Sequence, residues 1–268
     1  METTKTAVHF TDNYLLNPTN PISVNLIGAG GTGSKVLTAL MEINESLIAL
    51  EHAGLQVRLW DDDIITTANL GRQRFFESET GLYKSVALIN RINRCIGTNW
   101  KAETRKFEKD KFGRLPENTK AIITITCVDN VQARFDVAEI LKEISYCKNY
   151  MDDPKYWLDF GNSQDTGQVV LSTIGEIKQP NSEKYQTVAS LSFVTDEFGE
   201  LLRQSEQEDN TPSCSLAEAL EKQDLFINSS LTQMGCSLLW NLFRRGMTEY
   251  KGFFHNLKDF RTHPIKVA

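Results

Sequence analysis

ISVNLIGAGGTG, residues 22–33, joins a short apolar run to a glycine-rich turn. A continuous apolar run of this length is typical of a strand buried on both faces of a parallel sheet. Residues 34–51 then place apolar side chains at helical spacing. We therefore predict a strand, a tight glycine turn and a helix, which form the first half of a βαβ unit.

The rest of the chain continues this alternation. Further strands are predicted at 55–60, 121–128, 156–162 and 167–175, and helices at 80–96, 131–148, 217–223 and 224–246. Such alternation indicates right-handed crossovers between parallel strands. Residues 176–212 are expected to be a polar crossover loop with a short helix, and residues 249–265 a hairpin turning near Asn256. The expected fold class is α/β, a Rossmann-like open and mostly parallel sheet with helices on both faces and a C-terminal antiparallel extension.

Composition narrows the function classes. The 268 residues are 40% hydrophobic and 24% charged, and the net charge of −6 argues against a broad basic face that grips nucleic acid. The five cysteines form no C-x-x-C pair, so we expect neither structural zinc nor a disulfide framework. The N-terminus lacks signal-peptide features, and no apolar run approaches the roughly 18 residues of a membrane span. These features favour a cytoplasmic protein that binds neither nucleic acid directly nor a membrane.

The turn carries the G-x-G-x-x-G pattern as Gly28, Gly30 and Gly33. The first glycine makes the turn, the second lets the backbone approach a phosphate, and the third lets helix and strand pack closely. Asp61, at the end of the second predicted strand, is the candidate ribose-binding acid. It lies farther from the turn than the usual spacing of about 20 residues. The excess falls in 44–54, which we interpret as an insertion. A merely structural turn is the alternative.

Residues 61–84 read DDDIITTANLGRQRFFESETGLYK. An NAD-linked oxidoreductase has no general need for the polar and basic side chains that follow Asp61 in this stretch, namely Asn69, Arg72, Gln73 and Lys84. Fixed cations stabilise the charge that develops on phosphates when a nucleophile attacks ATP. An acid that holds Mg²⁺ would complete such a site. Asp129 follows a buried strand, at the edge where open α/β sheets bind ligands. The pattern therefore favours phosphoryl chemistry on ATP over hydride transfer.

The order and spacing of these residues resemble the ThiF/MoeB/ubiquitin-activating superfamily across residues 22–174. The matching positions, besides the three glycines, are Asp61, Asp63, Asn69, Leu70, Arg72, Gln73, Gly81, Lys84, Asp129 and Asn130. Residues 212–246 further resemble the ThiF-like proteins of bacterial PRTRC gene systems. The resemblance implies a single adenylating domain over 1–268, with a nucleotide-binding core at 22–174, a crossover loop at 175–213, and C-terminal helices and a hairpin at 214–268.

The resemblance also implies a reaction and a partner. Family members activate the C-terminal carboxylate of a small ubiquitin-like (β-grasp) protein, with ATP and Mg²⁺ as cofactors. The resemblance gives Asp61 to the ribose and Asp129 to Mg²⁺, with Asn130 beside Asp129. The remaining members of the set would contact or position the phosphates: Asn69, Arg72, Gln73 and Lys84.

Thiolating members of the family use a cysteine that attacks the adenylate. Cys214, in PSCS before a predicted helix, stands where such a cysteine is expected, and an ordinary partly buried thiol is the alternative. The other cysteines are expected to be structural.

Two departures from the family concern the ATP site and the subunit contacts. Many family members carry an N-terminal arginine that reaches the partner subunit's ATP, and residues 1–21 contain none. Either another residue supplies that charge, with Arg74 and Lys35 as candidates, or adenylation is weak. The family's usual homodimer stays an open expectation. Ala68 stands where the family has serine. A non-catalytic nucleotide-binding scaffold and, more remotely, an NAD-linked oxidoreductase remain the alternatives.

Overall fold

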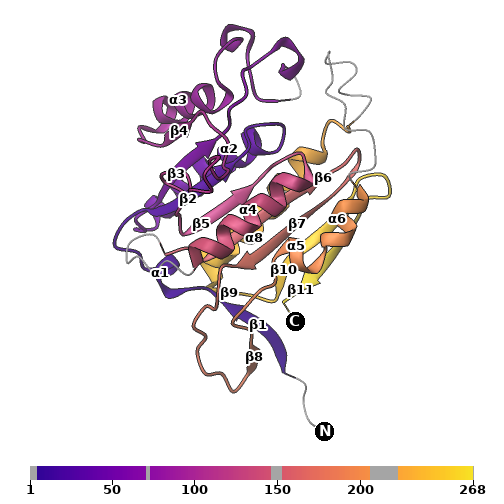
Figure 1. The fold of residues 1–268 in the computed structure, drawn as a ribbon. Coiled ribbons are helices and arrows are strands. Elements are labelled where there is room, and N and C mark those ends of the chain that lie inside the picture. Colours follow the sequence, from indigo (N-terminus) through magenta and orange to yellow (C-terminus); the bar gives the residue numbers. More distant parts are fainter. Residues whose placement is uncertain (1–4, 71–72, 146–152, 206–222, 268) are drawn as a thin grey trace.

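The computed structural model describes residues 5–70, 73–145, 153–205 and 223–267 (Figure 1). An eight-stranded sheet forms its centre, in the order β11-β10-β7-β6-β5-β2-β3-β4. Its strands are β2 (Ile22–Ile27), β3 (Leu55–Trp60), β4 (Lys101–Glu103), β5 (Ile123–Thr126), β6 (Tyr156–Asn162), β7 (Thr166–Thr173), β10 (Tyr250–Asn256) and β11 (Arg261–Lys266). A smaller sheet of order β8-β1-β9 lies near the N-terminus in Figure 1. It contains β1 (Thr6–Phe10), β8 (Tyr185–Thr187) and β9 (Met247–Thr248).

The large sheet confirms the predicted fold class. Strands β4, β3, β2, β5 and β6 pair in parallel, whereas β7, β10 and β11 extend the sheet in antiparallel fashion. The predicted hairpin is formed by β10 and β11, with Asn256 paired to Arg261 at its turn end. The carboxyl ends of the central parallel strands therefore meet at one edge of the sheet, where ligands bind in open α/β folds.

Helices cover both faces of the sheet, and each face has its own apolar cluster. One cluster joins the sheet to α2 (Gly33–Ala49), α3 (Lys84–Ile96) and α8 (Ile227–Arg245). The other joins it to α4 (Val131–Ser145), α5 (Val194–Glu197) and α6 (Gly199–Ser205), and α4 crosses the front of the sheet in Figure 1. Neighbouring residues Tyr156 and Trp157 belong to different clusters because successive side chains on a strand point to opposite faces.

Several short elements differ from the sequence-based expectation. Strands β1, β4, β8 and β9 and the helix α1 (Asn13–Leu16) were not predicted. The described part of 176–212 contains β8, α5 and α6 rather than a loop with one short helix. Strands of two to five residues carry too few side chains for a period-2 pattern. The predicted helix at 217–223 lies, except for Gln223, outside the described residues.

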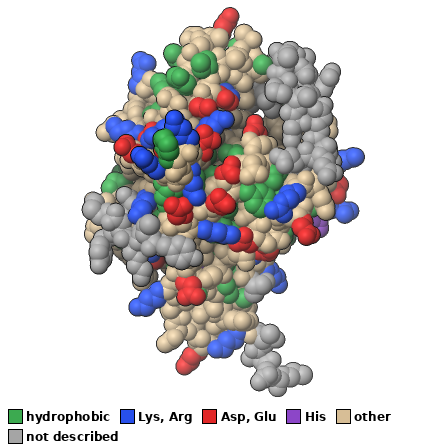
Figure 2. Space-filling model, viewed as in Figure 1, with side chains coloured by type: hydrophobic (Ala, Val, Ile, Leu, Met, Phe, Trp, Pro, Cys, Tyr) green, Lys and Arg blue, Asp and Glu red, His purple; other side chains and the backbone are tan. Residues whose placement is uncertain are grey.

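The surface carries both charge signs. On the face shown in Figure 2, Lys and Arg side chains are interspersed with Asp and Glu. None of the helices in the described ranges has the length and apolarity to cross a membrane.

Candidate nucleotide site

The glycine turn after β2 has the geometry that the motif predicts. Gly28 has φ +94°, and a Cβ there would lie 2.7 Å from the carbonyl oxygen of Cys127. A Cβ on Gly33 would lie 1.8 Å from the oxygen of Gly28, so α2 begins in direct contact with the turn. A Cβ on Gly30 would meet no atom of the described residues within 4 Å. The open side of the turn is therefore at Gly30, where the backbone is expected to face a phosphate.

Asp61 follows β3 and points into this turn. Its Oδ2 accepts a hydrogen bond of 2.6 Å from the N–H of Ala29, and its Oδ1 accepts one of 3.0 Å from the N–H of Asp63. Burial raises the pKa of the Asp61 carboxyl, while the hydrogen bond from Ala29 and the charge of Lys84 lower it. Each carboxylate oxygen keeps acceptor capacity beyond its one bond, which suits ribose hydroxyl groups.

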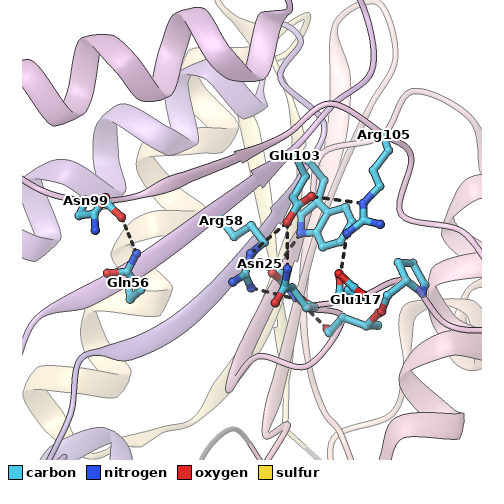
Figure 3. Close-up of polar contacts among 11 residues, drawn as sticks. Asn25, Gln56, Arg58, Asn99, Glu103, Arg105 and Glu117 are labelled. Atoms are coloured by element: carbon cyan, nitrogen blue, oxygen red, sulfur yellow. Dashed lines mark hydrogen bonds and ion pairs between the residues drawn. The ribbon is translucent and has the colours of Figure 1, made fainter.

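Figure 3 shows a polar network around Glu103 at the β3–β4 edge, and the backbone of Glu103 also holds that of Asp61. The N–H of Asp61 donates to the carbonyl oxygen of Glu103 at 3.1 Å. The Glu103 carboxylate pairs with Arg58 at 3.5 Å and with Arg105 at 3.2 Å. Buried Asn25 lies beside this network and accepts from Trp60 Nε1 at 3.0 Å. The backbone of Asp61 is thus anchored from β4, independently of the glycine turn.

Lys84 begins α3 and is nearly fully buried. Its Nζ lies 2.7 Å from Oδ2 of exposed Asp63, and its N–H donates to the Asp63 carbonyl at 2.9 Å. An ammonium group has three donors, so the bond to Asp63 leaves two for phosphate oxygens. The contact with phosphate stays a prediction, and the structure adds Asp63 as the residue that orients Lys84.

Asn69 and Gln73 belong to the same loop. Oδ1 of Asn69 accepts from the N–H and the hydroxyl of Thr66 at 2.9 and 3.1 Å, which leaves its amide nitrogen as the donor for a ligand. The side chain of Gln73 is buried, and its Oε1 has no hydrogen-bond partner among the described residues. Arg72, the predicted phosphate-binding arginine, lies outside the described residues.

Asp129 and Asn130 follow β5, the strand next to β2. Asp129 is exposed, and its Oδ1 accepts from Asn130 Nδ2 at 3.4 Å. Oδ1 of Asn130 accepts from the N–H of Ala133 at 2.7 Å and caps α4. Mg²⁺ typically uses one or two carboxylates together with substrate phosphates, and the Asp129 carboxylate fits that role. Within the described ranges, no three His, Cys, Asp or Glu side chains lie together as metal ligands. A Mg²⁺ ion held by one carboxylate and the substrate phosphates does not need a group of three protein ligands.

Below these loops lies a buried ion pair that sequence reasoning missed. Arg134 of α4 pairs with Asp159 of β6 at 3.1 Å, and both side chains are almost completely buried. Arg134 also donates to the carbonyl oxygens of Val128 and Phe160, at 2.8 and 3.1 Å. The pair therefore fixes the carboxyl ends of β5 and β6, next to Asp129. One buried arginine on a helix and one acid within a strand give no local signal that they meet.

The two cations considered as replacements for the missing N-terminal arginine lie close together. Lys35 of α2 and Arg74 both line a small hollow between α2 and α8. Lys35 Nζ also donates to the carbonyl oxygen of Gly31 at 3.2 Å. Whether either cation reaches ATP stays a prediction.

The cysteines separate by burial. Burial raises the pKa of Cys127 well above its ordinary value and that of Cys236 to about 12, which agrees with structural roles for both. Cys95 on α3 is exposed, so its burial does not support the structural role expected for it. Cys214, the candidate nucleophile, lies outside the described residues, as does Cys147.

The structure thus brings the described candidate residues for nucleotide binding to one edge of the sheet. Comparisons with known proteins bear on the fold and the family of the chain. Over 135 residues the chain is 30% identical to ubiquitin-like modifier-activating enzyme 5 of Aedes aegypti. This alignment covers 46% of this chain and 32% of that protein. The chain thus spans about a third of the length of this relative.

Solved structures share the fold at low sequence identity. Escherichia coli MccB aligns with a TM-score of 0.59 and 13% identity, over 95% of this chain and 63% of MccB. The complex of MccB with ATP aligns with a TM-score of 0.56, and the complex with selenomethionine MccA aligns with a TM-score of 0.57. Both are 14% identical to this chain, and both alignments cover 95% of this chain and 65% of MccB. Selenomethionine PaaA aligns with a TM-score of 0.59 and 13% identity, over 92% of this chain and 73% of PaaA.

The model of the ThiF family matches residues 14–264. This range includes the glycine turn and most of the C-terminal hairpin. The chain belongs to the ThiF family.

Proposed function

We propose that this protein adenylates the C-terminal carboxylate of a small ubiquitin-like protein at the expense of ATP. One observation carries the proposal: the Asp61 carboxylate bonds to the glycine turn at Ala29, beside the buried cation Lys84. A ribose acid next to a phosphate cation suits ATP, whereas hydride transfer would leave the cation unexplained.

In the proposed reaction, a carboxylate oxygen of the substrate protein attacks the α-phosphorus of ATP. The bond between the α-phosphorus and the oxygen bridging to the β-phosphorus breaks, and pyrophosphate leaves. Lys84, with Arg72 and Asn69 as further donors, would offset the negative charge that develops on the phosphates. Mg²⁺ at Asp129 would supply additional charge neutralisation when bound.

The relatives support this proposal. One relative is a ubiquitin-like modifier-activating enzyme, and MccB has been solved with ATP and with MccA. We extend the proposal to a β-grasp protein partner, a cytoplasmic location and the narrower kinship with PRTRC-system proteins. The homodimer and the single-domain organisation over 1–268 belong to the same proposal.

A nucleotide-binding assay tests the proposal first. We expect MgATP to raise the Tm of the wild type, and a chelator or Asp129→Ala to remove most of that rise. A ligand at about 100 times its Kd stabilises by roughly 2.7 kcal/mol, and each kcal/mol moves Tm by about 2–4 °C at this size. Asp136→Ala is the matched control, because Asp136 is exposed on α4, away from the end of β5.

The outcomes separate the alternatives. A Tm rise with NAD(H) alone would return the chain to the oxidoreductases. Wild type that binds MgATP but fails to exchange pyrophosphate, with β-grasp proteins of the same organism added one at a time, would favour a non-catalytic scaffold.

The proposed second step is thioester formation on Cys214. Its thiolate would attack the acyl carbon of the adenylate, and AMP would leave with the bonding electrons of the acyl–oxygen bond. We expect Cys214→Ala to abolish a thioester adduct with the substrate protein, which an added thiol cleaves by acyl transfer, while pyrophosphate exchange continues. Cys95→Ala is the matched control, because Cys95 is exposed on α3. An adduct that persists in Cys214→Ala would disprove the assignment.

A further inference from the structure

The glycine turn contains one more glycine than its motif requires. Gly31 does not have a positive φ. A Cβ on Gly31 would instead lie 2.7 Å from Nδ2 and 3.2 Å from Cγ of Asn228. Gly31 is therefore required by the close approach of a side chain from α8, nearly 200 residues away in sequence.

The amide group of Asn228 makes hydrogen bonds through both its oxygen and its nitrogen around this contact. Asn228 is 2% exposed. Its Oδ1 accepts from the Thr32 hydroxyl at 2.7 Å and from Asn162 Nδ2 at 3.3 Å, and its Nδ2 donates to Gln223 Oε1 at 3.0 Å. One side chain thus joins the glycine turn, the end of β6 and the segment before α8.

The first turn of α8 is itself anchored. Oδ1 of Asp224 accepts from the N–H groups of Phe226 and Ile227, at 2.7 and 3.1 Å. The N–H of Asp224 donates to the carbonyl of Gln164 at 2.7 Å, in the turn between β6 and β7. Asp224 thus ties the start of α8 to the turn between β6 and β7, so Asn228 presents its amide to the glycine turn from a fixed position.

We infer that Asn228 is a positioning residue that holds the glycine turn in its ATP-binding conformation. This inference rests on the proposed function. Thr32 lies directly before α2, whose first N–H groups are the ones that would face the phosphates. A turn that adopts the binding conformation for only a fraction of the time binds its ligand more weakly in proportion. Loss of the Thr32–Asn228 bond therefore weakens ATP binding although neither side chain is required to touch ATP.

The test measures the Kd of MgATP by calorimetry for Thr32→Val, Asn228→Ala and the double variant. Each single variant is expected to weaken binding about 3- to 10-fold, the range for one hydrogen bond. The double variant is expected to be no weaker than the worse single one, because both remove the same bond. Thr32→Ser keeps the hydroxyl and should bind as wild type does. Thr38→Val is the matched control, since its hydroxyl donates to the Ser34 carbonyl instead.

A second pair of variants tests the steric contact. Gly31→Ala is expected to weaken MgATP binding, and adding Asn228→Ala to it should restore part of the loss by opening space for the new methyl group. A Tm measured without nucleotide shows whether each variant is folded, and Thr32→Val keeps the test decisive where Asn228→Ala does not fold.

Two results would overturn the inference. If wild type binds MgATP and the Thr32→Val and Asn228→Ala variants bind it equally well, this inference alone is overturned. It is also overturned if the losses of affinity in the two single variants multiply in the double variant. Wild type that does not bind MgATP would overturn the proposed function and the inference with it.

Discussion

Asp61 is a carboxylate whose protonation controls its proposed role. Ribose hydroxyls donate to the ionised form, so binding favours ionisation. Burial raises its pKa above the ordinary 3.8. We therefore expect the affinity for adenosine, which has no phosphate to titrate, to fall as the pH is lowered. This fall should begin at a higher pH than for an ordinary aspartate.

Calorimetric titrations of adenosine across the acidic range measure this effect. Asp61→Asn should bind weakly at every pH and lose the dependence. Asp62→Asn is the control, because its side chain is exposed and adjacent in sequence. An equal pH dependence in wild type and Asp61→Asn would remove Asp61 from the ribose site.

Individual site residues differed in how far sequence could predict them. Gly28, Gly33 and Asp61 take the places expected from the motif because backbone geometry dictates them locally. Asn228 could not be predicted, since its role depends on a contact between distant segments. Gly31, which the G-x-G-x-x-G pattern does not require, was the one feature of the turn that pointed to such a contact.

Between α4 and the sheet, the Arg134–Asp159 pair joins the carboxyl ends of β5 and β6. Removing one partner of a buried pair leaves an uncompensated buried charge, which costs about 3–5 kcal/mol. We expect Arg134→Ala to lower the free energy of unfolding by this amount, as measured by urea denaturation. Lys142→Ala, which breaks the exposed pair with Asp196, should cost about 1 kcal/mol or less. Similar losses in both variants would contradict this view of the pair.

Among the helices and strands, length decided what could be predicted. Apart from the three-residue β4, the strands of the central sheet and the helices α2, α3, α4 and α8 lie in segments long enough to show apolar periodicity or a continuous apolar run. Strand β1 has five residues and pairs with β8 in parallel, from Thr6 opposite Tyr185 to Val8 opposite Thr187. These two strands are far apart in the sequence, so their pairing depends on tertiary contacts. The local sequence of neither strand therefore predicts it.

For the molecule as a whole, one buried histidine connects the small sheet to the large one. His9 of β1 is fully buried; its Nδ1 lies 2.7 Å from the carbonyl of Val188 and its Nε2 lies 3.0 Å from the Tyr156 hydroxyl. A carbonyl only accepts, so Nδ1 carries the proton and neutral Nε2 accepts from Tyr156. A protonated ring would turn a second N–H toward the Tyr156 oxygen, which already accepts from the N–H of Asp12 at 3.0 Å.

This connection predicts how the stability of the whole protein responds to acid. Burial lowers the pKa of His9 below 6.5, so below pH 6.5 the unfolded chain binds a proton that the folded chain refuses. The stabilising contribution is complete above pH 6.5 and is lost as the pH falls from there toward the lowered pKa. We expect urea unfolding at about pH 7.5 and about pH 5 to show a smaller difference in unfolding free energy for His9→Gln than for wild type. His263→Gln, exposed on β11, should keep the wild-type difference. If His9→Gln also kept it, the two sheets would be joined without a pH-sensitive contact at His9.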